Sequence, residues 1–421
     1  MCSNNESPVT SHQSLVTSHQ SPVNSSHQSL VTSHQSPVTS SHQSPVTKIG
    51  ITGQNGFIGL HLFNCLGVEK DVERIPFERT YFDDPHKLRE FVRSCDVIVH
   101  LAALNRHEDM QVLYDVNVGL VQKVVEAMEA EEVTPHVIFA SSSQEERDNL
   151  YGASKREGRR IFEAWAARSD GKCTGIIIPN VFGPFGRPNY NSVIATFCHK
   201  LTHGEMPEIH VDGSLKLIYV TDLCQDIIRI LRGKIMESPY YAPHCAEKKV
   251  SEILALLNSY KQIYFDKQIV PEIQGHFEQS LFNTFFCSID HATFFPGKLI
   301  PHADNRGHFV EVLKLDNTGG QVSFSTTVPG ITRGDHYHTR KFERFAVIKG
   351  KARIQLRRIE TDEVLDFVID AEECPGFVDM PVWYTHNITN IGDEDVYTIF
   401  WINEFYDSED GDTFFEKVEK G

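Results

Sequence analysis

The feature that most constrains this sequence is a glycine-rich turn behind a short apolar segment. Residues 48–52 form the apolar segment, and Gly53, Gly56 and Gly59 follow it ahead of a second apolar stretch. The first glycine permits a tight turn, the second lets a ligand approach the backbone, and the third lets a helix pack on the strand. The N-terminus of such a helix can hold a pyrophosphate. The pattern therefore predicts a strand, a turn and a helix that bind a dinucleotide in an α/β fold.

Two further apolar runs predict buried strands of the same parallel sheet. Residues 96–103 read DVIVHLAA, and residues 137–143 read VIFASSS, so each run ends in small or hydroxyl-bearing residues. An open parallel sheet places its ligand crevice at the carboxyl ends of its strands. We therefore expect Leu101, Ala102 and the serines of residues 141–143 to lie at a binding crevice.

A tyrosine and a lysine four residues apart follow the serines. Tyr151 and Lys155 would share one face of a helix. A nearby ammonium group favours tyrosinate and lowers the phenol pKa, so Tyr151 would deliver a proton to a carbonyl oxygen as a hydride arrives. A serine would hydrogen-bond the same oxygen, and we favour Ser142.

These motifs resemble the extended short-chain dehydrogenase/reductase family, in its nucleotide-sugar-modifying branch. Further matches are Asn117, residues 179–184 (PNVFGP) and residues 219–222 (YVTD), and the likeness spans roughly residues 48–288. The resemblance implies a Rossmann-like, doubly wound parallel sheet that binds a nicotinamide dinucleotide. The serines precede the tyrosine by only eight to ten residues, which is shorter than in many members and leaves the acting serine open.

The resemblance also implies which residues contact the cofactor, and the chain near residue 75 bears on the choice between NAD and NADP. At the end of the second strand, an acidic residue would bind the ribose 2′-hydroxyl of NAD, and an arginine would suit the 2′-phosphate of NADP. Residues 72–79 lie in this region, read VERIPFER and contain both acidic and basic residues. With Arg74 and Arg79 close together, we expect NADP(H). The expected contacts are Gly53, Asn55, Gly56, Phe57, Ile58, Gly59, Arg74, Leu101, Ala102, Tyr151 and Lys155.

A different chemistry is predicted in the C-terminal third. His336 and His338 would point to one face of a strand, because strand side chains alternate with a period of two. Glu343 and His386 can join them only if the strands pair into a barrel. Three imidazoles and one carboxylate suit Zn²⁺ or another first-row divalent metal. A closed four-coordinate site would indicate a structural ion, and an open position would indicate catalysis.

The spacing of these residues resembles both cupin motifs, which include Gly330, Gly350 and residues 381–386 (PVWYTH). Short alternating strands separated by turn residues also predict a small β-barrel. In addition, residues 304–309 (DNRGHF) resemble the opening of deoxysugar 3,5-epimerases, a cupin-fold family. We therefore expect an all-β cupin barrel over residues 296–421.

The remaining chain and its composition complete the predicted organisation. Residues 8–47 repeat a Ser-His-Gln-Ser unit, so we expect residues 1–47 to be a disordered low-complexity segment, followed by the reductase domain over residues 48–290. A formal net charge of −17 argues against nucleic-acid binding. Nine cysteines without a Cys-x-x-Cys pair indicate reduced thiols, and no apolar run is long enough to insert in a membrane. These features predict a cytoplasmic protein.

A sugar-type reductase followed by a metal-motif cupin resembles the bifunctional capsular polysaccharide enzymes of the CapF family. The resemblance implies a UDP-linked 4-keto-6-deoxy-N-acetylhexosamine substrate on the route to UDP-N-acetyl-L-fucosamine. The cupin would invert C3, and the reductase would then reduce the C4 ketone with NADPH, giving UDP-2-acetamido-2,6-dideoxy-L-talose. The order follows from chemistry, because the C4 ketone is what acidifies the C3 hydrogen. The pairing of many cupin barrels implies a homodimer.

The sequence leaves two matters open. The base in the cupin is unassigned among Lys314, Lys341, His302 and Tyr384. The alternatives to a bifunctional enzyme are a one-site NAD(P)-dependent nucleotide-sugar reductase or dehydratase whose cupin is structural and oligomerising, and a non-enzymatic NADP(H) sensor. The serine, tyrosine and lysine argue against the sensor.

Overall fold

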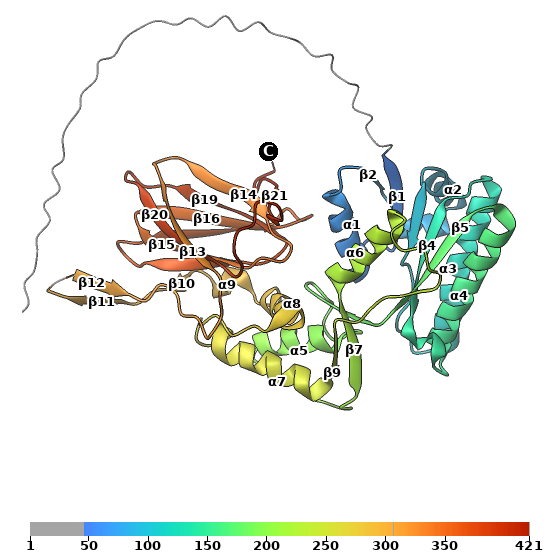
Figure 1. The fold of residues 1–421 in the computed structure, drawn as a ribbon, viewed down its shortest axis with the longest axis horizontal. Helices are drawn as coiled ribbons and strands as arrows, with labels where there is room; N and C mark the ends of the chain where they lie inside the picture. Colours follow the sequence, from blue (N-terminus) through green and yellow to red (C-terminus); the bar gives the residue numbers. More distant parts are fainter. Residues whose placement is uncertain (1–45, 306, 421) are drawn as a thin grey trace, which may run out of the picture. The chain divides into compact units, whose positions relative to one another are not determined.

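The computed structural model describes residues 46–305 and 307–420. The low-complexity segment expected over residues 1–47 lies almost wholly outside these residues. Strands and helices carry the labels of Figure 1.

The N-terminal half contains a six-stranded sheet in which every neighbouring pair of strands is parallel. In spatial order its strands are β2 (Val72–Ile75), β1 (Thr47–Thr52), β3 (Val97–His100), β4 (His136–Ser142), β5 (Lys172–Ile178) and β8 (Tyr240–Tyr241). Every residue of β3 is buried. Such continuous burial is typical of a central parallel strand that is covered on both faces.

Helices cover both faces of this sheet (Figure 1). The first group consists of α1 (Phe57–Gly67) and α6 (Val220–Leu231), and the second of α2 (Pro85–Arg93), α3 (Met110–Ala130) and α4 (Leu150–Ser169). Each group forms its own hydrophobic core with the strands: Leu62 and Ile227 belong to one core, and Val124 and Phe162 to the other. The predicted Rossmann-like, doubly wound α/β fold is therefore confirmed.

A smaller sheet and a helical layer follow. The sheet contains β6 (Asn180–Phe182), β7 (Ser214–Tyr219) and β9 (Ala246–Lys249). The helices are α5 (Val193–Thr202), α7 (Val250–Tyr260), the π-helical turn η3 (Lys261–Phe265), α8 (Gly275–Phe286) and α9 (His291–Phe294). Phe282 and Phe285 are fully buried in the core beneath them. None of the described helices has the length and apolar character that crossing a membrane requires.

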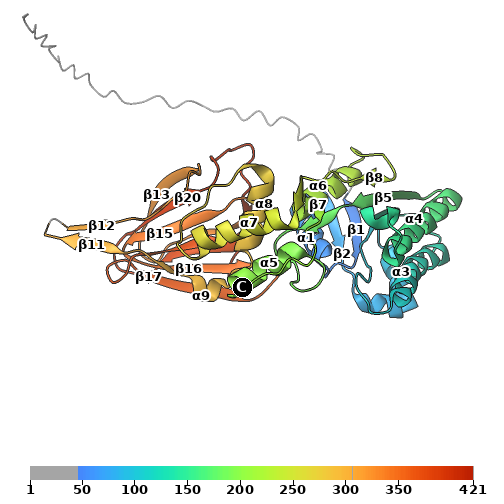
Figure 2. The same ribbon diagram turned by 90° about the horizontal axis from the view of Figure 1, so that it is seen from below.

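The C-terminal part is built from antiparallel strands. One sheet contains β10 (Gly297–Lys298), β18 (Gly376–Met380), β15 (Glu343–Lys349), β20 (Val396–Ile402) and β13 (Gln321–Thr327), and the other contains β17 (Val364–Asp370), β16 (Lys351–Arg358), β19 (Tyr384–Asn390), β14 (Thr332–Tyr337) and β21 (Phe414–Phe415). Phe345 and Val378 of one sheet share a core with Ile354 and Ile388 of the other. The predicted all-β, cupin-like domain is confirmed. Figure 2 shows a hairpin, β11 (Pro301–Asp304) and β12 (Gly307–Val310), extending away from these sheets.

Strand β14 contains one extra residue relative to its partner β19. The register shifts between Gly334 and His336, which leaves Asp335 in a bulge. Both bulge residues have left-handed backbone angles, with φ of +105° at Gly334 and +57° at Asp335. A Cβ on Gly334 would lie 2.7 Å from the carbonyl oxygen of His386. Only glycine meets both the conformation and the close approach at this position.

Candidate functional site

The glycine turn joins β1 to α1 as the sequence predicts. Gly53 has φ of +78°, and a Cβ there would lie 2.9 Å from the amide nitrogen of Ala102, which follows β3. A Cβ on Gly59 would collide with the carbonyl oxygen of Gly53. Gly56 caps α1 without a side-chain hydrogen bond to the first amides of the helix. The structure therefore brings the turn, the helix N-terminus and the end of β3 together as a cradle suited to a pyrophosphate.

Arg74 does not extend from β2 as a free cation. Its guanidinium donates to the carbonyl oxygen of Phe63 at 3.0 Å and lies 4.0 Å from the centroid of the Phe63 ring. It also lies 3.5 Å from the carboxylate of Glu360. These contacts hold Arg74 on the surface of α1. Arg79, the second arginine of the predicted pair, is exposed at the start of the short helix η1 (Arg79–Asp83).

Tyr151 and Lys155 lie near the start of α4 and share one side of it. The Nζ atom of Lys155 lies 6.0 Å from the centroid of the Tyr151 ring and donates to the carbonyl oxygen of Ala140 at 3.0 Å. Because Ala140 belongs to β4, this bond fixes the lysine at the carboxyl end of the central strands. The hydroxyl of Tyr151 donates to Oδ1 of Asn105 at 3.3 Å.

Asn105 was not singled out from the sequence, although it lies in the loop after β3, where the crevice was expected. That loop is held by Asn117 of α3, a family match. The Oδ1 atom of Asn117 accepts from the amide of Leu104 at 2.6 Å, and its Nδ2 atom donates to the Leu104 carbonyl at 3.0 Å. Asn117 therefore positions the loop, and the loop positions Asn105 against Tyr151.

Burial sets the pKa values of this pair. It lowers the pKa of Lys155 to about 8, against a smaller opposing effect of the Glu145 carboxylate. It raises the pKa of Tyr151 to about 12, with a further contribution from Tyr190. The expectation that the phenol pKa is brought down is therefore wrong for this structure, because burial and the neighbouring Tyr190 both raise it. Tyr151 stays protonated at neutral pH, which is the form that donates a proton.

The three serines at the end of β4 lie in different environments. Ser141 is buried and donates to the carboxylate of Glu145, which also accepts from Arg159 at 2.8 and 3.0 Å. The half-buried Ser142 accepts from the amide of Gln144 at 3.2 Å and begins the short helix η2 (Ser143–Glu146). Ser143 is exposed. The hydroxyl proton of Ser141 is therefore used in the hydrogen bond to Glu145. Ser142, the predicted residue, accepts through its oxygen, so its hydroxyl proton is left for another acceptor.

A cavity of about 370 Å³ lies beside the small sheet. Its walls include Asn180 and Phe182 from the predicted substrate-side motif, and Leu217 of β7. Residues 191–194, at the start of α5, and 208–211, in the loop before β7, complete it. Sequence reasoning missed these two segments, since neither carries a motif or a periodic pattern.

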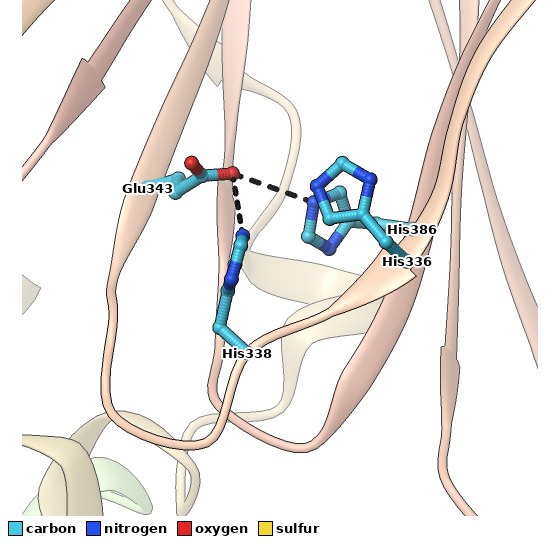
Figure 3. Close-up of side chains that lie close together, drawn as sticks. All are labelled: His336, His338, Glu343 and His386. Atoms are coloured by element: carbon cyan, nitrogen blue, oxygen red, sulfur yellow. Dashed lines mark ion pairs between the residues drawn. The ribbon is translucent and has the colours of Figure 1, made fainter. Parts of the chain in front are cut away.

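The C-terminal sheets bring the four predicted metal ligands together (Figure 3). One potential ligand atom from each of His336, His338, Glu343 and His386 lies within 4.8 Å of the others. Oε2 of Glu343 is 3.2 Å from Nε2 of His338 and 3.4 Å from Nε2 of His386. Both of these Nε2 atoms are buried without a hydrogen-bond partner of acceptable geometry. Buried, unpartnered nitrogens beside a carboxylate fit a divalent metal.

The charges in this cluster hold Glu343 and His336 in the forms that bind metal, whereas they favour the protonated form of His338. Burial disfavours the ionised carboxylate of Glu343, but its close contacts with His338 and His386 hold its pKa well below the usual value. Burial, together with the other two imidazoles, lowers the pKa of His336 to about 4. For His338, burial is outweighed by the nearby Glu343 carboxylate, and the pKa is raised. A metal cation would take the place of the proton that the contact with Glu343 favours on His338.

The proposed bases of the C-terminal domain are spread widely. Lys314 is exposed and pairs with Glu311 at 2.8 Å, and His302 is exposed on the β11–β12 hairpin. Lys341 is buried, and its ammonium group donates to the carbonyl oxygen of Gly411. Tyr384 is the remaining candidate, two residues before His386 on β19 and so on the same side of that strand.

Comparison with known proteins supports both halves of this arrangement. Residues 49–237 match the model of the NAD dependent epimerase/dehydratase family, and residues 302–414 match that of the polysaccharide biosynthesis C-terminal domain. A UDP-2-acetamido-2,6-beta-L-arabino-hexul-4-ose reductase of Pseudomonas aeruginosa is 33% identical over 384 residues, which are 89% of this chain and 100% of that protein. The spore coat polysaccharide biosynthesis protein SpsL of Bacillus subtilis is 25% identical over 123 residues, 27% of this chain and 82% of that protein.

Solved structures agree with these relatives. The capsular polysaccharide assembling protein CapF from Staphylococcus aureus is 34% identical, with a TM-score of 0.57 over 88% of this chain and 99% of that one. RMD from Pseudomonas aeruginosa complexed with NADPH, at 18% identity and a TM-score of 0.50, covers 58% of this chain and 99% of its own and shares the fold alone. The matches at 33 and 34% identity, which cover 89% and 88% of this chain, place both halves in one family. The chain therefore belongs to the family of the capsular polysaccharide assembling protein CapF.

Proposed function

We propose that this chain, a nucleotide-sugar enzyme of the NAD(P)-dependent oxidoreductase type, reduces the C4 ketone of a UDP-linked 2-acetamido-2,6-dideoxyhexos-4-ulose with NADPH, after inversion at C3. The product is UDP-2-acetamido-2,6-dideoxy-L-talose. One observation carries the proposal: Tyr151 lies beside the buried Lys155, which is fixed at the carboxyl end of the parallel sheet. The relative that covers most of this chain, at 33% identity, is a reductase of a UDP-linked hexulose.

The N-terminal residues divide the work of reduction. The turn at Gly53 and Gly56 holds the pyrophosphate of the cofactor, which supplies the hydride. Lys155 binds the nicotinamide ribose from its fixed place beside β4. Tyr151 donates its phenolic proton to the C4 oxygen, and Ser142 donates a hydrogen bond to the same oxygen.

The cavity beside β6 is suited to the UDP part of the substrate. Its volume of about 370 Å³ falls within the usual range for small-molecule sites, roughly 300–1,000 Å³. Asn180 supplies polar surface for the phosphates, and the more accessible Val193 and Ile209 supply apolar surface for the base. Residues 191–194 and 208–211 form the rest of the cavity wall. A nucleotide bound between them would fix the position of the attached sugar.

In the C-terminal domain we propose that His336, His338, Glu343 and His386 hold Zn²⁺. A bound Zn²⁺ would polarise a carbonyl oxygen and so favour loss of the C3 proton. Tyr384 lies on the same side of β19 as His386, and burial raises its pKa, so it is the candidate that returns a proton to C3 after another group has removed the original proton from the opposite face. Inversion has to precede reduction, since the ketone that acidifies C3 is consumed at the Tyr151 site.

A specific observation also favours the alternative, in which the barrel is structural. Four protein ligands converge, and that number completes a tetrahedral zinc site without an open position. In that case the chain is a one-site reductase, and the barrel stabilises or assembles the protein.

Val322 and Phe324 on the edge strand β13 are exposed apolar side chains, which supports a homodimer. The eight cysteines among the described residues are free, which supports a reducing, cytoplasmic environment.

The test uses the full chain and the UDP-linked 4-keto sugar in D₂O. Without nicotinamide, NMR should show deuterium entering at C3, and with NADPH the ketone signal should disappear as absorbance at 340 nm falls. Reduction without deuterium entry would support the one-site reductase. If neither occurs, the proposed substrate is wrong.

A further inference from the structure

The strand that carries the histidines is bordered on both sides. β14 pairs with β19 through His336 and His386, and it pairs with β21 through His336 and Phe415 and through Tyr337 and Phe414. β21 belongs to the last ten residues of the chain, about 80 residues after the histidines. The C-terminal segment therefore forms one edge of the proposed metal site.

Asp412 makes the densest set of contacts between this segment and the site. Its side-chain carboxylate accepts from the backbone amides of Thr339 at 3.1 Å, Arg340 at 3.0 Å and Lys341 at 3.1 Å. It also accepts from the hydroxyl of Thr339 at 2.7 Å. Asp412 is 7% exposed and has φ of +40°, a left-handed conformation that non-glycine residues rarely adopt. A carboxylate that accepts several N–H groups makes strong, charge-assisted hydrogen bonds, so it fixes the turn that connects His338 to Glu343.

The main chain of Asp412 acts on His338 directly. Its carbonyl oxygen lies 2.5 Å from Nδ1 of His338. A carbonyl oxygen only accepts hydrogen bonds, so Nδ1 carries the proton, and Nε2 faces Glu343 as the potential ligand atom. Hydrogen bonds of this kind orient metal-binding histidines and fix their tautomer.

The other end of the His-x-His sequence is tied to the same segment. Oδ1 of Asp335, the bulge residue before His336, accepts from the amide of Val418 at 3.2 Å and from the side chain of Asn387 at 3.1 Å. The carbonyl oxygen of Asp335 accepts from the amide of Glu416 at 2.9 Å. The chain on both sides of the two histidines, at Asp335 and at residues 339–341, is therefore held by hydrogen bonds to residues 412–418.

A buried arginine anchors the segment in turn. Arg357 of β16 is 1% exposed and donates to the carbonyl oxygens of Lys417 and Val418, each at 2.7 Å. It also forms an ion pair with Glu416 at 2.7 Å. Val418 is itself fully buried. The segment is thus held to the barrel independently of the four ligands, which is what a preformed support requires.

We propose that residues 412–418 are a clamp that presets the metal site, with Asp412 as a positioning residue that orients His338 and holds the turn to Glu343. The proposal rests on the proposed metal site. By linkage, metal binding and the order of the clamp favour each other. Loss of the Asp412 carboxylate should therefore weaken metal binding without removing a ligand.

The experiment measures Zn²⁺ affinity of the purified full chain by competition with a chromophoric chelator. Asp412→Ala should bind Zn²⁺ roughly 10- to 100-fold more weakly, the usual effect of losing an outer-shell partner. Asp412→Asn keeps the shape but has one acceptor in place of two, so a smaller loss is expected, and it serves if the alanine variant does not fold. Asp410→Asn is the matched control, because Asp410 lies in the same loop, its side chain is 69% exposed, and its carboxylate pairs with Arg340 rather than with the backbone amides of residues 339–341.

A second readout does not depend on affinity or activity. Hydrogen exchange of the amides of residues 412–418 should slow when Zn²⁺ is added to the wild-type chain, and this protection should be reduced in Asp412→Asn. If the Asp412 variants bind Zn²⁺ as tightly as the wild type and the control, the clamp is rejected and the site stands. If the wild type and His386→Ala take up the same amount of Zn²⁺, the ligand assignment itself fails.

Discussion

His336 lies directly opposite His386 in the pairing of β14 with β19, with the two ring centroids 4.6 Å apart. The bulge at Asp335 creates this pairing, because without the extra residue Asp335 would lie opposite His386. A shift of one residue turns a strand's side chains to the other face of the sheet. The left-handed backbone at Gly334 and Asp335 is therefore a condition for the cluster.

Gly334→Ala should disrupt both the barrel and the proposed metal site. The added methyl group would meet the carbonyl oxygen of His386, and φ of +105° would strain any residue with a Cβ. We expect a loss of about 1–3 kcal/mol in the free energy of unfolding, together with weaker Zn²⁺ binding. Denaturant unfolding and chelator competition measure the two effects. Gly319→Ala, where a Cβ would have nothing within 4 Å, is the control and should behave as the wild type.

Tyr151→Phe should separate the two proposed reactions. The variant lacks the proposed proton donor for the C4 oxygen, so NADPH oxidation should fall by about 100- to 10,000-fold. Deuterium entry at C3 should remain at the wild-type rate, since that reaction belongs to the other domain. Tyr241→Phe, at a position 63% exposed on β8, is the matched control. Full NADPH oxidation in Tyr151→Phe would mean that another group supplies the proton.

The serines should give different results when each is replaced by alanine. Ser142→Ala should lower kcat roughly 10- to 1,000-fold at an unchanged melting temperature, because it removes a hydrogen bond to the reacting oxygen. Ser141→Ala should instead destabilise the fold by about 1–3 kcal/mol, because the buried Glu145 loses a donor. Kinetics and thermal unfolding of both variants make the comparison. The opposite pattern would transfer the catalytic assignment to Ser141.

Cofactor preference should depend on Arg79 rather than Arg74. Arg74 is held by the carbonyl oxygen and ring of Phe63, so Arg74→Ala should mainly lower stability. Arg79 is exposed and available to a 2′-phosphate, and its loss should raise the KM for NADPH by about 10-fold or more, as expected for a hydrogen bond to a charged group. The KM for NADH should not change. An unchanged NADPH KM in Arg79→Ala would exclude this residue.

The sequence predicted those parts of the site that depend on local pattern. The glycine turn, the Tyr-Lys pair on one helical face and the shared strand face of His336 and His338 follow from spacing along a strand or helix, whereas Glu343 and His386 were placed beside them by the resemblance to the cupin motifs. The direction of Arg74, the sign of the Tyr151 pKa shift and the support from Asp412 could not be predicted in this way. Each depends on which distant segment packs against the residue: Phe63 on α1, the surroundings that desolvate the phenol, and a loop more than 70 residues from His338.

The pH dependence of reduction should be set by Lys155 on its alkaline side. Burial lowers the pKa of this lysine to about 8, so the ammonium form predominates below that pH and is lost above it. Because we propose that the ammonium group binds the cofactor ribose, kcat/KM for NADPH should fall as the pH rises through about 8. Tyr151, with its pKa raised to about 12, stays protonated throughout and contributes no decrease in this range.

Two variants test that assignment. Glu145→Gln removes the carboxylate that raises the lysine pKa, so the alkaline decrease should move to lower pH. Glu163→Gln, which also removes a carboxylate bonded to Arg159 but is not among the groups that shift Lys155, should leave the profile in place. A decrease that stays at the same pH in Glu145→Gln would assign it to a group other than Lys155. The folded protein should also become more stable, relative to its unfolded chain, as the pH rises from about 8 toward 10.5, since the unfolded lysine retains its proton there.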